Sequence, residues 1–163
     1  MRKIIFLDFD GVLNTEHYQA LLQFQGKLRQ DKHGAFFDLA AVRQLKRIID
    51  ATSADLVIES SWKSLGLGEM QALWRVCNLP GRVIDITPSL GRNACKGEEI
   101  AAWLAKNATP DTRYAIIDDE YVVLASQIPH FIWTNPYEGL TKDQVDRAIS
   151  MLTDDYNLRI DIS

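Results

Sequence analysis

The chain contains few of the residues that mark secreted, zinc-binding or membrane proteins. Its 163 residues include two cysteines, Cys77 and Cys95, without a CxxC motif or histidines at metal-ligand spacing, which argues against a disulfide framework and a zinc site. No apolar stretch approaches the about 20 residues of a transmembrane helix, and no tract rich in Pro, Gly or Ser divides the sequence. We therefore expect one domain over residues 1–163, located in the cytoplasm and away from membranes.

Positive charge is also scarce. The sequence has 18 Lys and Arg against 22 Asp and Glu, and its formal net charge is −4. This balance argues against a broad basic surface for nucleic acids and leaves a local basic groove open.

Apolar runs and amphipathic segments alternate along the chain. Runs rich in β-branched and aromatic residues predict strands at 4–7, 55–59, 82–86, 114–117 and 130–133. Apolar residues at helical spacing predict helices at 39–52, 65–76 and 141–152, a helix that begins near Lys96, and a short helix at 122–127. The alternation predicts an α/β fold: a doubly wound, Rossmann-like sheet of five parallel strands with helices on both faces.

Several aromatic residues need a place in this fold. Residues 15–37 have no clear pattern, and their Phe24, Phe36 and Phe37 are candidates for a small lid or for packing on the core, which we expect for Phe36 and Phe37. The tryptophans are expected in the core rather than on a stacking platform, with Trp62 as a possible border of a substrate entrance. They are Trp62, Trp74, Trp103 and Trp133.

The first predicted strand ends in two acids. Asp8 and Asp10 follow an apolar run, and residues two apart on a strand point to the same side. Gly11 lets the backbone turn sharply, so both carboxylates can share a pocket. They would repel each other unless a cation joined them, and Mg²⁺ prefers oxygen ligands and keeps waters that a phosphate can replace. The motif indicates phosphoryl chemistry, whereas alone it also fits a strand and a solvated turn.

Three more motifs follow at strand ends or at a helix start: Ser60-Ser61, Lys96 and Asp118-Asp119. Doubly wound sheets bind ligands beyond the carboxyl ends of their strands. Together with Asp8-x-Asp10-Gly11, these motifs in this order resemble the haloacid dehalogenase-like (HAD) superfamily of phosphohydrolases, over nearly the whole chain. The segments Ser60-Ser61-Trp62-Lys63 and Gly139-Leu140-Thr141 look most similar to the capless branch, with a minimal cap or none, found in Swiss Army Knife RNA repair proteins.

The resemblance implies a Mg²⁺-dependent phosphatase that forms an aspartyl-phosphate. Asp8 would be the nucleophile, and Asp10 the general acid and then the base. Lys96 would supply positive charge to the phosphate, with Arg92 as the competing cation. Mg²⁺ would be held by Asp8, the backbone carbonyl of Asp10 and Asp118, with Asp119 bonding through water or orienting the site.

The remaining phosphate contacts are less sharply defined by the sequence. Ser60 is the preferred hydrogen-bond donor to a phosphoryl oxygen, and Ser61 is the alternative. Gly11, Ser61 and Lys63 are expected as substrate-binding residues. Glu59 departs from the pattern, because a carboxylate at the end of a buried strand is costly unless it is paired, and Lys63 and Lys96 are its candidate partners.

Two other functions compete with the phosphatase. A signalling receiver domain would need its phosphoacceptor Asp at the end of a middle strand, where this chain has Ser60. A catalytically weak phosphate-binding module is opposed by intact Asp8, Asp10, Lys96 and Asp118. An open site suits a phosphorylated nucleic-acid end or a phosphoprotein, and small phosphate esters are equally open. The sequence does not predict the oligomeric state.

Overall fold

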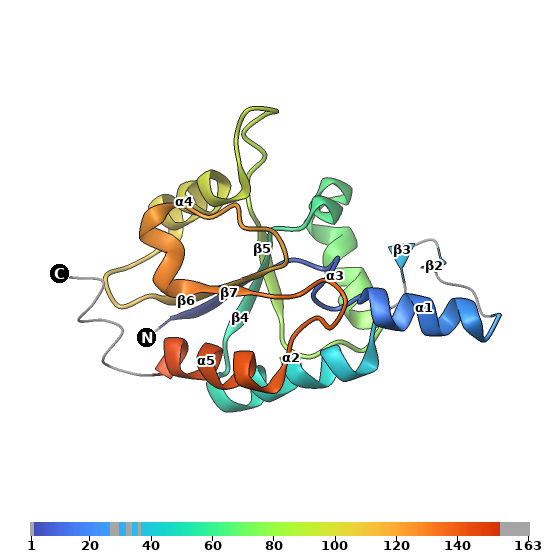
Figure 1. Ribbon diagram of the computed structural model, residues 1–163. Coiled ribbons are helices and arrows are strands. Elements are labelled where there is room, and N and C mark those ends of the chain that lie inside the picture. Colours follow the sequence, from blue (N-terminus) through green and yellow to red (C-terminus); the bar gives the residue numbers. More distant parts are fainter. Residues whose placement is uncertain (1, 27–29, 32–33, 36, 154–163) are drawn as a thin grey trace.

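The computed structural model describes residues 2–26, 30–31, 34–35 and 37–153. A five-stranded parallel sheet forms its centre, with the strand order β5-β4-β1-β6-β7 (Figure 1). The strands are β1 (Lys3–Leu7), β4 (Asp55–Ile58), β5 (Val83–Ile86), β6 (Arg113–Asp118) and β7 (Phe131–Trp133). The five predicted strands and the doubly wound parallel sheet are confirmed, and β1 lies in the middle.

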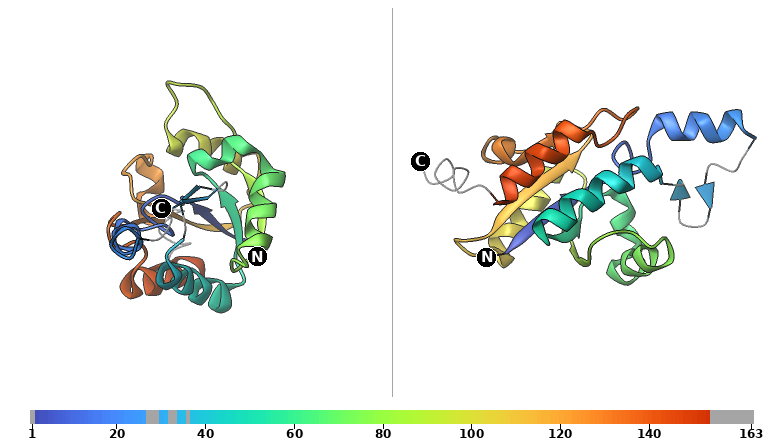
Figure 2. Two further views of the ribbon diagram at one scale, coloured as in Figure 1. Left: turned by 90° about the vertical axis from the view of Figure 1, so that its right-hand side faces the viewer. Right: turned by 90° about the horizontal axis from the view of Figure 1, so that it is seen from below.

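Helices cover both faces of this sheet. The helices α2 (Leu39–Thr52), α3 (Leu67–Val76) and α5 (Lys142–Thr153) pack on one face in a single apolar cluster, and α4 (Lys96–Asn107) packs on the other face. Figures 1 and 2 show α2 and α5 side by side along the same face. None of the helices in the described part of the chain is long and apolar enough to cross a membrane.

Local chemistry sets the helix boundaries. The predicted α2 is confirmed, because the Asp38 carboxylate accepts a hydrogen bond from the Ala40 N–H (2.9 Å) and Ser53 ends the helix in a left-handed conformation. The predicted helix at 65–76 begins later, since residues Ser61–Leu65 form the 3₁₀ helix η1 and Gly66 (φ 97°) precedes α3. The short helix predicted at 122–127 is wrong in place and type: Ala125–His130 form the 3₁₀ helix η2, which contains Pro129.

The segment without a sequence pattern contains a helix and a ribbon. Helix α1 (Glu16–Phe24) and the antiparallel pair β2 (Gln30–Asp31) and β3 (Gly34–Ala35) project beyond the carboxyl ends of the strands (Figure 1). Phe24 is 90% exposed and packs on no core. Phe37 packs on the core as predicted: its ring centroid lies 5.7 Å from that of Phe9 and 5.9 Å from that of Trp62. Phe36 lies outside the described residues.

The tryptophans divide into two groups. Trp74 and Trp103 are buried and Trp62 packs against the core, as expected. The prediction for Trp133 is wrong, because its side chain is 57% exposed. Trp133 is the last residue of β7, which lies at the edge of the sheet.

Candidate active site

The carboxyl ends of three neighbouring strands carry carboxylates at the same level of the sheet. Leu7 of β1 pairs in register with Ile58 of β4 and Ile117 of β6, so the next residues are Asp8, Glu59 and Asp118. Residues at one level of adjacent parallel strands point to the same face. The three side chains therefore form a row, and their exposed fractions are only 1–3%.

Lys96 places its ammonium group beside this row. Its Nζ lies 3.0 Å from Asp118 Oδ2 and 3.5 Å from Asp8 Oδ2. Arg92, the competing cation, lies on the exposed loop between β5 and α4. The geometry therefore favours Lys96 as the cation of the site.

The start of α4 is held by residues that the sequence interpretation missed. The Gly97 N–H donates to the Val122 carbonyl (2.9 Å), and the buried Gln127 side chain donates to the Gly97 carbonyl (2.8 Å) and accepts from the Leu124 N–H (2.9 Å). A Cβ atom on Gly97 would lie 2.8 Å from the Val122 oxygen. These contacts join the first turn of α4 to the loop after β6, and so fix Lys96 beside Asp118. The glycine directly after Lys96 is the sequence signal that could have indicated this close contact.

Lys63 does not have its predicted partner. Its Nζ donates to Glu99 (2.8 Å), to the Thr87 hydroxyl (2.9 Å) and to the Pro88 carbonyl (3.2 Å), whereas neither oxygen of Glu59 accepts a hydrogen bond from a described residue. An ammonium group has three N–H donors, and this arrangement uses all three. It therefore contradicts the pairing of Lys63 with Glu59 and leaves Lys63 no donor for a phosphate.

The buried carboxylates perturb one another. Burial, followed by the charge of Asp118, raises the pKa of Asp8 to about 8, and the same two causes raise the pKa of Glu59 well above its usual range. Burial opposes ionisation of Asp118, but hydrogen bonding with Glu59 and the charge of Lys96 outweigh it and lower the pKa of Asp118. A proton on Glu59 would be donated to Asp118. The row thus holds more negative charge than one lysine offsets, and it favours either protons or a bound cation.

Asp119 brings a third carboxylate into metal-binding range. Asp8, Asp118 and Asp119 each offer an oxygen within 4.8 Å of the others. Burial, followed by hydrogen bonding with Asp118, raises the pKa of Asp119 to about 6. Both oxygens of Asp118 already accept hydrogen bonds, from Lys96 (3.0 Å) and from the Glu120 N–H (3.0 Å). This group of acids is suited to a hard divalent cation.

The turn after β1 depends on a residue without a Cβ atom. Gly11 has φ 77°, and a Cβ built on it would collide with the Asp119 carboxylate, 2.6 Å from its Cγ atom. The Gly11 carbonyl accepts a hydrogen bond from the buried Thr134 hydroxyl (3.0 Å). Asp10 is exposed, and the Asn14 side-chain amide donates to its carboxylate (2.7 Å). Asn14 and Thr134 were not predicted as site residues, since nothing in their spacing marks them.

The two adjacent serines have different environments. Ser60 is fully buried next to Glu59, and its hydroxyl oxygen accepts a hydrogen bond from the Trp62 N–H (3.3 Å). Its hydroxyl hydrogen is therefore still available for donation. Ser61 is exposed at the start of η1. The buried position beside the carboxylate row favours Ser60 over Ser61 as the phosphate-binding serine.

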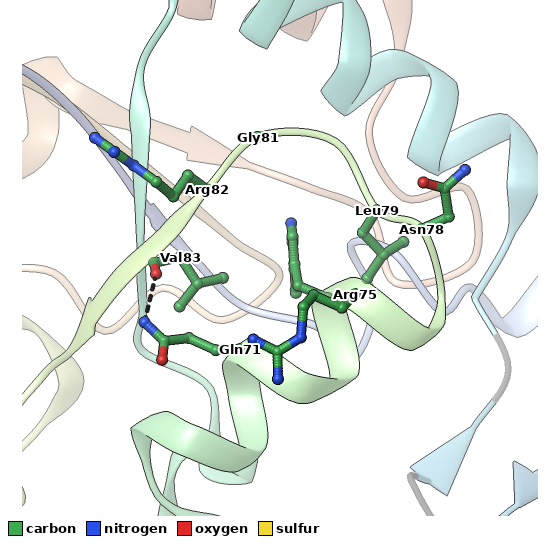
Figure 3. A pocket seen from close by; sticks show the side chains of 8 residues that line it. Gln71, Arg75, Asn78, Leu79, Gly81, Arg82 and Val83 are labelled. Atoms are coloured by element: carbon green, nitrogen blue, oxygen red, sulfur yellow. Dashed lines mark hydrogen bonds between the residues drawn. The ribbon is translucent and has the colours of Figure 1, made fainter.

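Two cavities differ in their relation to this row. A cavity of about 400 Å³ begins at Asp10, Gly11 and Asp119 and continues along α1 past Glu16 and Gln19, so it is lined by two acids that neighbour the row. The other cavity, of about 420 Å³, lies between α3 and the beginning of β5 and contains two arginines (Figure 3). Because it adjoins the amino end of a strand, it is at the opposite end of the sheet from the acids.

A parallel sheet of this order, with Asp8 directly after its central strand and Lys96 and two further acids beside it, defines a HAD-like domain. The sequence model of the family described as "HAD domain in Swiss Army Knife RNA repair proteins" matches residues 4–145, and the chain belongs to this family. Searches of curated proteins and of solved structures found no significant match. The family supports a hydrolase of the phosphatase type.

Proposed function

We propose that the protein is a Mg²⁺-dependent phosphomonoesterase that acts through an aspartyl-phosphate on Asp8. The observation that carries the proposal is the buried row of Asp8 and Asp118 with Lys96 3.5 Å and 3.0 Å from their oxygens. A nucleophilic carboxylate needs this setting, since it must attack a negatively charged phosphoryl group without being repelled. The proposed substrates are phosphorylated molecules with an accessible phosphate, such as a nucleic-acid end or a phosphoprotein.

The acids would hold Mg²⁺ through Asp8, Asp118, Asp119 and the backbone carbonyl of Asp10. The fit rests on the grouped carboxylates and on Gly11, whose missing Cβ leaves room for Asp119. When bound, Mg²⁺ would offset the negative charge of the phosphoryl oxygens and the carboxylates.

The residues of the chain supply the remaining chemistry. Asp8 would attack the phosphorus and form a P–O bond while the ester P–O bond breaks, and Asp10 would protonate the leaving oxygen. In the second step Asp10 would take a proton from a water that attacks the phosphorus, which releases phosphate and restores Asp8. Asp10 suits this exchange because it is exposed and its carboxylate is oriented by Asn14. Lys96 and the Ser60 hydroxyl would bind phosphoryl oxygens.

Phosphate release from p-nitrophenyl phosphate tests the proposal. We expect hydrolysis with Mg²⁺, loss of it when EDTA removes divalent cations, and recovery on adding Mg²⁺ again. Asp8→Asn and Asp10→Asn should both be inactive. Hydrolysis that persists in EDTA or in Asp8→Asn would contradict the proposal, as would a wild type that is inactive with Mg²⁺.

A Gly11→Ala variant is expected to bind Mg²⁺ at least about tenfold more weakly than wild type, because the new methyl group must displace the Asp119 carboxylate. The positive φ adds about 1–2 kcal/mol of backbone strain. Gly91→Ala is the matched control, since Gly91 also has a positive φ (101°) and no atom within 4 Å of a new Cβ. Calorimetric titration with Mg²⁺ would measure both variants. Equal loss of affinity in the two would attribute the effect to strain alone and contradict the contact with Asp119.

A further inference from the structure

Two exposed aromatic rings lie in contact at the rim of the candidate site. Tyr121 is 51% exposed and Trp133 is 57% exposed, and their ring centroids are 5.1 Å apart with an angle of 73° between the planes. In such an edge-to-face pair one ring covers at most one face of the other. At least three of the four ring faces are therefore not covered by the partner ring, and solvent reaches both residues.

The pair is held in place by its surroundings. The Trp133 indole N–H donates to the Asp119 carbonyl (2.8 Å), and the Gln144 side chain donates to the Trp133 carbonyl (2.8 Å). Tyr121 also packs edge to face on Phe131, with 5.3 Å between ring centroids. A ligand that stacks here would meet rings whose orientation is already fixed, so little conformational freedom is lost on binding.

The pair adjoins the carboxylates. Trp133 pairs in register with Asp118, and Tyr121 follows Asp119 by two residues. The strands β1, β6 and β7 are neighbours in this order. The backbone of Trp133 therefore lies about two strand spacings, roughly 10 Å, from the backbone of the strand that leads to Asp8. One molecule can therefore stack an aromatic group on these rings and place a phosphate at Asp8.

We propose that Trp133 and Tyr121 form a stacking subsite for the nucleobase of a substrate whose phosphate reacts at Asp8, an inference that rests on the proposed function. A nucleoside phosphate carries an uncharged planar ring that the ribose holds away from the ester, which suits the spacing. An aryl phosphate attaches its ring directly to the ester oxygen and so falls short of the rings. The charged neighbours of Tyr121 in the loop are Asp119 and Glu120, which favour a neutral ring over a second phosphate.

Binding to the non-hydrolysing Asp8→Asn variant in Mg²⁺ tests the subsite by calorimetry. Adenosine 5′-monophosphate and ribose 5-phosphate share the phosphate ester and differ in the base. We expect the nucleotide to bind about tenfold more tightly, as stacking of one base on an aromatic ring implies. Adding Tyr121→Leu should reduce this ratio to within about twofold, whereas Tyr121→Phe should keep it.

Phe24→Leu is the matched control, because Phe24 is an aromatic residue that is 90% exposed on α1, and it should leave the ratio at about tenfold. The subsite would be overturned if Asp8→Asn bound the nucleotide and ribose 5-phosphate with equal affinity. It would also be overturned if adding Tyr121→Leu left the ratio of the two affinities unchanged. These binding results stand apart from hydrolysis: wild type that cleaves ribose 5-phosphate without preference for the nucleotide refutes only the subsite.

The base could come from a nucleic-acid end or from a free nucleotide. Binding of a short single-stranded oligonucleotide with a terminal phosphate distinguishes these two sources. Tighter binding of the oligonucleotide than of the mononucleotide, lost in Tyr121→Leu, would assign the subsite to a nucleic-acid end. Equal affinities, both reduced in Tyr121→Leu, would assign it to a free nucleotide. If Tyr121→Leu weakens neither affinity, both assignments are contradicted.

Discussion

An Asp8→Asn variant is expected to lose phosphatase activity by at least about a thousandfold and, at the same time, to be more stable than wild type at pH 8 without metal. The activity falls because an amide cannot form the phosphoryl ester that a nucleophilic carboxylate forms. The stability rises because burial and the charge of Asp118 make an ionised Asp8 costly, and raise its pKa to about 8. The gain should be a few kcal/mol, since about 1.4 kcal/mol accompanies each pKa unit.

The pH dependence of this gain follows from the same pKa. The folded protein, with a pKa of about 8 for Asp8, binds more protons between pH 4 and pH 8 than the unfolded chain, where the ordinary value is 3.8. The free energy of unfolding of metal-free wild type therefore falls as pH rises through this range. The Asp8→Asn variant lacks this contribution, so its advantage should grow from pH 5 to pH 8.

Urea unfolding in EDTA at pH 5, 6.5 and 8, with phosphate release measured in parallel, would check both parts. Asp10→Asn is the matched control: Asp10 is exposed, so its loss should abolish activity with little change in unfolding. An active Asp8→Asn protein, or one that is less stable than wild type at pH 8, would contradict the prediction.

Buried segments were predictable from the sequence because their apolar patterns are local. The run around Phe6 reads as a doubly covered strand, and it is the central strand β1. The helical spacing of apolar residues over 39–52 predicted α2, which Asp38 caps. The position of Asp8 and Asp118 after apolar runs also placed them at the carboxyl edge of the sheet, since a parallel topology brings strand ends together, and the resemblance to HAD-like proteins added Lys96.

The details that failed depend on contacts between distant segments. Lys63 pairs with Glu99, 36 residues away, a partner that no local pattern indicates. Trp133 was expected in the core, but the strand order places it at the end of an edge strand, where its side chain is 57% exposed. Helix α1 lacks the buried apolar face of the other helices, since of its nine residues only Leu22 is buried.

A Lys96→Met variant is expected to be destabilised by about 3–5 kcal/mol at pH 8 without metal, and to be inactive. Among the described residues, Lys96 is the only cation ion-paired with Asp8 or Asp118. Its ammonium resists burial, yet the carboxylates of Glu59, Asp8 and Asp118 raise the pKa of Lys96, so it stays charged. Removing it leaves these buried carboxylates without a cation.

The loss should shrink on acidification, because protonated carboxylates no longer need the ammonium. Between pH 8 and pH 5 Asp8, whose pKa is raised to about 8, takes up a proton in the folded state. Urea unfolding of wild type and variant at both pH values in EDTA would measure this. Lys46→Met is the control, because Lys46 pairs with Asp50 on the surface, and its loss should cost less than about 1 kcal/mol at either pH.

A second substitution separates charge balance from catalysis. Glu59→Gln removes one buried carboxyl group whose oxygens accept no hydrogen bond from the described residues, so in the Lys96→Met background it should restore part of the lost stability. Activity should stay absent, because the amide introduced at position 59 is neutral and does not restore the positive charge that Lys96 supplied near Asp8. If instead the double variant unfolds as easily as Lys96→Met, the cost of losing Lys96 lies in packing rather than in charge. Recovered stability without recovered activity would assign to Lys96 two separable roles, in balancing the buried acids and in binding the phosphate.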